Sequence, residues 1–147
     1  RNCSSQMEGS CLQLIQRFAA LPLQWQLWET NNECGMEPRK AHSAVYHPDG
    51  EGYMVVFGGS DGSFCLNTTY TLDLHFKNWE MLDASGEAPA PRTNHSGTMV
   101  GNQMYIFGGA KYRTYMNDLW ALNLATARWT QVHFGSGPPR SPTVRYG

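Results

Sequence analysis

Hydrophobic stretches alternate with polar turns along most of the chain, and the same order of stretches occurs twice. Each copy has a segment of small residues, a continuous apolar run, a segment with a hydrophobic residue at every second position, and a segment that begins at a tryptophan. These segments are 42–46, 53–57, 70–74 and Trp79 onward in the first copy, and 95–100, 104–107, 120–124 and Trp129 onward in the second. Short runs of this kind between turn residues are typical of β-strands. The pattern therefore predicts two successive units of four strands.

The two copies share a register. Twenty residues separate Gly59 from Trp79, and twenty separate Gly109 from Trp129. The copies differ in length only between the first two strands, where residues 47–52 replace a tight Gly101-Asn102 turn, because loops tolerate insertions that strands do not. A glycine pair ends the apolar run in both copies. We expect these glycines to adopt positive φ or to approach the next unit closely.

The repeated glycine pair and tryptophan, a repeated Arg-x-x-His and the Asn-Asp-Leu-Trp segment at 117–120 together make the chain resemble the kelch repeat. Members of this family fold as β-propellers, in which each repeat forms one four-stranded blade around a central channel. The resemblance covers roughly residues 28 to 147. The residues that carry the structural signature of the repeat are Gly58, Gly59, Trp79, Gly108, Gly109 and Trp129.

The resemblance implies an all-β fold, a partial kelch-type β-propeller over residues 23–147. It contains two complete four-stranded blades at approximately 39–82 and 92–133, with strands of flanking blades at 23–30 and 140–147. We expect the tryptophans to pack between neighbouring blades. Propellers of this family commonly have about six or seven blades. We therefore expect the remaining blades to come from the parent chain or from another chain.

Residues 1–22 have a different pattern. Ser5 to Glu8 fits a capping box, and Leu12, Ile15 and Phe18 then recur at helical spacing until Pro22. This predicts a short amphipathic helix or linker. Its role is either to cover the side of the propeller or to bind a partner.

Composition excludes several classes of partner. The formal net charge is −1, with acidic and basic residues interspersed, so nothing favours nucleic acid or an anionic membrane surface. No apolar run is long enough to span a bilayer. The cysteines at 3, 11, 34 and 65 form no CxxC pair and are too sparse for a disulfide scaffold, which favours a cytoplasmic protein. Glycosylation-like triplets at Asn2, Asn67 and Asn94 favour the alternative, an extracellular one.

Candidate catalytic chemistry is sparse. The sequence contains no serine elbow, zincin helix, phosphate loop or paired-cysteine zinc site. His42 and His95 occupy the same place in the two copies, and imidazoles near a channel could bind a metal. A residue repeated in each blade is more simply structural, and the next copy, from Arg140 to Thr143, has no such histidine. We therefore predict no catalytic residue, metal or cofactor. The resemblance leaves a metal-dependent propeller enzyme, of oxidase or specifier type, as an alternative.

The loops after the glycine pairs are the stronger functional candidates. Loops 60–66 and 110–116 have equal length but unrelated content, whereas the strands around them are repeated. The resemblance places both loops on the face that carries the links between blades, a face that often binds peptides. The candidate partner-binding residues are Phe64, Tyr112, Arg113, Tyr115, Arg39, Arg92, Asn94 and Arg140.

The arginines in this set follow prolines and have two interpretations. They either bond backbone carbonyls within the propeller or ring one mouth of the channel to hold acidic partners. The sequence thus predicts a protein–protein interaction module, an adaptor or scaffold. A purely architectural subunit of a large assembly is the second alternative.

Overall fold

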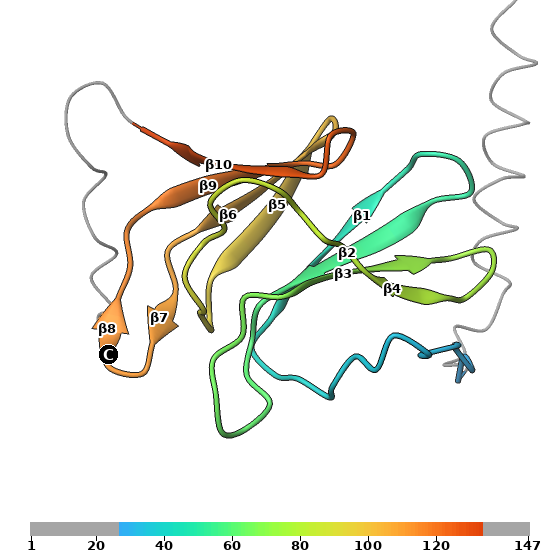
Figure 1. Cartoon of the computed structure of the whole chain (residues 1–147), viewed down its shortest axis with the longest axis horizontal. Coiled ribbons are helices and arrows are strands. Elements are labelled where there is room, and N and C mark those ends of the chain that lie inside the picture. The colour runs from blue at the N-terminus through green and yellow to red at the C-terminus, as the bar shows by residue number, and fades with distance from the viewer. Residues whose placement is uncertain (1–26, 134–147) are drawn as a thin grey trace, which may run out of the picture.

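The computed structural model describes residues 27–133, which form two four-stranded antiparallel sheets and a small hairpin (Figure 1). The first sheet has the order β1 (Ser43–His47), β2 (Tyr53–Phe57), β3 (Thr69–Asp73) and β4 (Trp79–Met81). The second has the order β5 (Ser96–Val100), β6 (Gln103–Phe107), β9 (Leu119–Asn123) and β10 (Arg128–Val132). Each predicted strand of the two copies is present, within one residue of its predicted start.

Two features differ from the prediction. Loop 110–116 contains a hairpin of β7 (Ala110–Lys111) and β8 (Thr114–Tyr115) that periodicity did not indicate. Residues 27–30, the described part of the predicted strand 23–30, are not in a strand. The chain makes one parallel bridge here, from Asn31 to Asn78, the residue before β4. The predicted helix in 1–22 and strand at 140–147 lie outside the described residues.

The two sheets approach most closely through their first strands, β1 and β5. An added Cβ on Gly97 of β5 would lie 2.7 Å from Cβ of Ser43 on β1, closer than real side chains approach. Only small residues fit on both strands at this point. This is the physical reason for the small-residue composition of the first segment in each copy.

The glycine pairs have the predicted backbone conformation. Gly58 and Gly59 have φ values of 67° and 92°, and Gly108 and Gly109 have 63° and 92°. A Cβ on Gly58 would lie 2.9 Å from Cε1 of His95 in the second repeat, which confirms the predicted close approach. Gly59 differs, because its Cβ would instead meet the carbonyl oxygen of Lys40 at 2.7 Å, within its own repeat.

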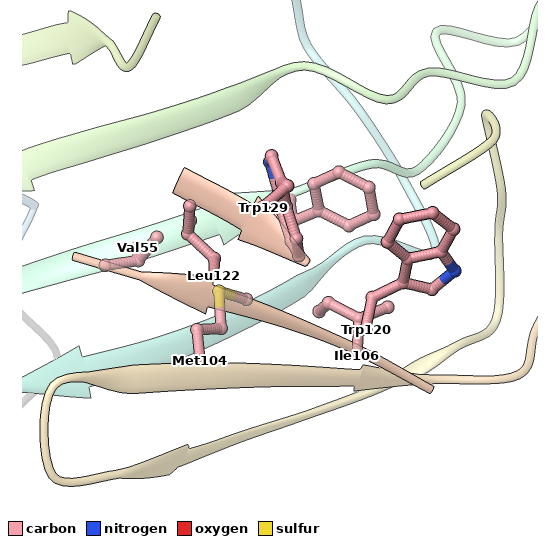
Figure 2. Close-up of a cluster of buried hydrophobic side chains, with 7 residues drawn as sticks. Val55, Met104, Ile106, Trp120, Leu122 and Trp129 are labelled. Atoms are coloured by element: carbon pink, nitrogen blue, oxygen red, sulfur yellow. The ribbon is translucent and has the colours of Figure 1, made fainter. Parts of the chain in front are cut away.

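The hydrophobic core lies between the two sheets (Figure 2). It joins β2 of the first sheet to β6, β9 and β10 of the second through Val55, Phe57, Met104, Ile106, Trp120, Leu122 and Trp129. The rings of Phe57 and Trp129 pack across the interface, with centroids 5.0 Å apart. Trp129 is 3% exposed, whereas Trp79, its equivalent in the first sheet, is only partly buried. The predicted packing between blades is thus seen for Trp129.

Burial of the second strands differs between the sheets. Val55, Val56 and Phe57 at the end of β2 are buried on both faces. In β6, burial alternates, with Met104 and Ile106 buried and the intervening Tyr105 partly exposed. Within residues 27–133, no helix is long and apolar enough to cross a bilayer.

Candidate functional site

The two variable loops project from the same end of the two sheets (Figure 1). Each is tied to the link that precedes its own sheet. Ser60 exchanges two backbone hydrogen bonds of 2.9 Å with Lys40, and Ala110 exchanges two of 2.8 Å with Thr93. The links are also joined to each other, because the Asn94 N–H donates to the Ala41 carbonyl at 3.0 Å. Loops 60–66 and 110–116 and these links form one surface, here called the loop face, as the resemblance implied.

The loop face presents large aromatic side chains to solvent. Phe64 is 64% exposed, Tyr112 67% and Tyr115 62%, and Arg113 between the tyrosines is exposed as well. Exposed aromatic and arginine side chains are those most often found at the centre of protein interfaces. Asn94, another predicted residue of this face, is also exposed. The structure therefore places five of the predicted partner-binding residues on one accessible surface.

Local hydrogen bonds and backbone conformation shape both loops. The Asp61 carboxylate accepts the N–H groups of Phe64, at 2.8 Å, and Ser63, at 2.7 Å. These two bonds lower the pKa of Asp61. In the other loop, Tyr112 has φ of 55° at the turn of the β7–β8 hairpin, a conformation that costs a bulky side chain free energy. Phe64 and Tyr112 thus sit on turns of defined geometry.

Arg92 does not belong to the accessible surface. Its side chain is fully buried and donates two hydrogen bonds to the Asp118 carboxylate, at 2.7 and 2.9 Å. It also donates to the carbonyl oxygens of Gly108, at 2.8 Å, and Ala90, at 3.0 Å. Burial alone would raise the pKa of Asp118, but hydrogen bonds from Arg92 and Trp120 outweigh it and hold that pKa below its usual value. Arg92 therefore fixes the glycine turn of its own sheet.

Arg39 has the same structural role in the first sheet. Its side chain is 1% exposed and donates to the Gly58 carbonyl and to Thr68 Oγ1, both at 3.1 Å. The guanidinium also lies over the Tyr70 ring, 4.8 Å from its centroid. The prediction that Arg39 and Arg92 bind a partner is thus corrected, because their donors are already used inside the repeats. Arg140 lies outside the described residues.

Sequence reasoning missed Asp118. It stands nine residues after the second glycine of its copy, the offset at which the first copy has Thr68. A buried arginine needs an opposite charge nearby. The acid that stands at this offset in the second copy was the available signal. Ser43 was also missed. Its hydroxyl is 2.8 Å from Nε2 of His95 in the other repeat, and a contact between residues so far apart in the sequence leaves no local pattern.

The two repeated histidines are in different environments. His95 is buried between the sheets, edge-on to the Phe57 ring, whereas His42 is exposed. Nδ1 of His95 is buried and has no hydrogen-bond partner among the described groups. Residues 27–133 contain no group of three or more His, Cys, Asp and Glu side chains arranged to hold a metal ion. His95 has the geometry of a structural contact between repeats.

We expect the protein to lose stability in acid through His95. Burial, together with the positive charge of Arg92, lowers the pKa of His95 from 6.5 to about 4. The unfolded chain therefore binds a proton at this position between pH 6.5 and 4, while the folded chain does not, so stability falls as pH decreases through this window. Between about pH 7 and pH 4.5, the wild type should lose roughly 2–3 kcal/mol more than H95Q.

Urea denaturation of both proteins at several pH values measures this difference. H75Q is the control, because His75 is exposed and is not among the groups that shift the pKa of His95. It should show nearly the pH dependence of the wild type. Parallel stability curves for the wild type and H95Q would contradict the prediction.

Comparison with known proteins identifies similar sequences. The profile of a family described as "KLHDC2/KLHL20/DRC7 Kelch-repeats domain" matches residues 4–145. Acyl-CoA-binding domain-containing protein 5 of Arabidopsis thaliana is 31% identical over 121 residues, which cover 81% of this chain and 18% of that protein. Host cell factor 1 of Homo sapiens is 33% identical over 127 residues, covering 75% of this chain and 6% of that protein. The chain thus spans only a small part of the length of these relatives.

Proposed function

Because this chain belongs to the kelch-repeat family, whose domains typically bind proteins, we propose that it is a protein-interaction module that holds a partner through its loop face. The observation that carries the proposal is the group of exposed aromatic side chains, Phe64, Tyr112 and Tyr115, on the two loops of one surface. Burial of such side chains is a main source of binding free energy in protein interfaces.

The contrast between scaffold and loops supports this assignment. The strands, the glycine turns and the buried arginines are built alike in the two repeats, whereas loops 60–66 and 110–116 share little sequence. One loop carries Phe64 on a turn held by Asp61, and the other carries two tyrosines around an arginine on a hairpin. A repeated scaffold with individual loops is the arrangement expected when the loops choose the partner.

The relatives suggest a module that works within larger proteins. Their printed names describe an acyl-CoA-binding domain-containing protein and a host cell factor, two different kinds of protein that share similarity with this chain. We propose an adaptor or scaffold role, in which the module supplies binding and other parts of the assembly supply activity.

Affinity capture with matched variants tests the loop face. The triple variant Tyr112→Ala, Arg113→Ala, Tyr115→Ala should lose the proteins that the wild type captures from cells of its source. Truncating an interface hot spot typically costs roughly 2 kcal/mol or more of binding, whereas a surface change costs under about 0.5 kcal/mol of stability. The melting temperature of the variant should therefore stay close to that of the wild type.

A second triple variant away from both loops is the control. Met81, Asp83 and Glu87 are exposed and belong to neither loop. Changing these three residues to alanine removes a comparable set of side chains and should leave capture unchanged. If the loop variant still captures every wild-type partner, the recognition surface is elsewhere and the proposal fails.

A further inference from the structure

A cavity of about 270 Å³ lies between the two sheets at the end opposite the loop face. One wall comes from the first sheet, and Leu124, at the β9–β10 turn, closes the other side. The lining residues are Tyr53, Thr71, Asp73, Asn78, Glu80, Leu82 and Leu124. Tyr53, Thr71 and Glu80 come from the adjacent strands β2, β3 and β4, which pair in register. Six of these seven residues belong to the first repeat, and Leu124 belongs to the second.

The cavity lining has an apolar part and an acidic part. Leu82 and Leu124 provide apolar surface, and two carboxylates, Asp73 and Glu80, provide negative charge. The described lining residues include no lysine, arginine or histidine. Lys77, on the adjacent turn, has its Nζ 5.0 Å from the centroid of the Trp28 ring, outside the lining. The negative charges of the cavity are thus not neutralised by a basic side chain of its own lining.

Each carboxylate has one oxygen that its known hydrogen bonds do not use. Asp73 accepts the N–H groups of His75, at 2.8 Å, and Phe76, at 2.7 Å, both through Oδ1. Glu80 accepts a bond of 3.2 Å from Asn78 through Oε1. Burial raises the pKa of Tyr53, and the negative charge of Asp49 raises it further, so a third acid acts near this cavity. The local charge therefore favours a cation.

We propose that this cavity binds an arginine side chain of a partner protein. A guanidinium presents five N–H donors in a plane and pairs well with carboxylates, while its three-carbon stem packs on apolar surface. Carboxylates beside leucine side chains match both parts of that group. Because the cavity lies at the opposite end from the loop face, this would be a second contact site, independent of the first.

NMR titration of the whole chain with a capped Gly-Arg-Gly peptide tests the proposal. Saturable shifts of the backbone amides of Thr71, Asn78 and Leu124 are expected. Glu80→Gln should weaken binding at least fivefold, because it removes the charge and keeps the shape. Glu87→Gln, an exposed acid outside the lining, is the matched control and should bind like the wild type. The same peptide with citrulline, which is neutral and nearly isosteric, should bind at least fivefold more weakly.

Several outcomes would overturn the proposal. These are equal binding of the arginine and citrulline peptides, tighter binding of a capped Gly-Lys-Gly peptide, no saturable shift at millimolar peptide, or shifts confined to other residues. Unchanged thermal melting of Glu80→Gln would show that its weaker binding does not come from misfolding. The loop-face triple variant should bind the arginine peptide normally, so failure of the loop-face proposal and failure of this one can be told apart.

Discussion

Replacing Arg92 with methionine is expected to lower the free energy of unfolding by roughly 3–5 kcal/mol, the usual loss when one partner of a buried ion pair is removed. The change would leave the Asp118 carboxylate, whose side chain is 25% exposed, without the two hydrogen bonds and the positive charge of Arg92. It would also leave the Gly108 carbonyl without the Arg92 bond that holds the glycine turn. Stabilities of single domains are only about 5–15 kcal/mol, so this loss is large.

Two further variants separate the ion pair from simple packing. Arg39→Met removes the equivalent arginine, whose partner at the same offset is the neutral Thr68. It should cost less, because the carboxylate that Arg39 pairs with, Glu37, is largely exposed. Adding Asp118→Leu to Arg92→Met should restore part of the stability, since apolar replacement of a whole buried pair is often tolerated. Urea denaturation measures all three. A loss for Arg92→Met no greater than that for exposed Arg113→Met would be inconsistent with the role assigned to Arg92.

Trp129→Ala is expected to cost roughly 3–5 kcal/mol, the range for truncating a large aromatic side chain in a core. The indole is almost fully buried, belongs to the cluster between the sheets and contacts the Phe57 ring of the other sheet. Its removal would open a cavity at the contact that joins the two repeats. The variant should therefore weaken both the second sheet and its attachment to the first.

The equivalent tryptophan gives a matched comparison within the same molecule. Trp79 lies in β4 and Trp129 lies at the equivalent place in β10. Trp79, however, is only partly buried in the described chain. Trp79→Ala should therefore cost clearly less than Trp129→Ala in the same denaturation experiment. Equal losses would show that burial between the sheets does not set the contribution of Trp129.

The loop face was largely predictable, and the reason lies in the repeat. Two copies with a common register show which residues belong to the scaffold, and the segments that differ must be loops. Phe64, Tyr112 and Tyr115 fall in those segments and are exposed. The arginines were misassigned because Arg39 and Arg92 also recur in polar links, and a polar link does not reveal whether its side chain points into the blade.

What the sequence by itself determined is the local architecture: the strands, their order and the glycine turns. Periodicity and turn residues act over a few neighbouring positions, so they are legible without any tertiary contact. The pairings of Arg92 with Asp118 and of His95 with Ser43 were decided only by the tertiary structure. The cavity between Glu80 and Leu124 was also decided only by the tertiary structure. Each joins residues far apart in the sequence, and their distances and burial depend on how the two sheets pack together.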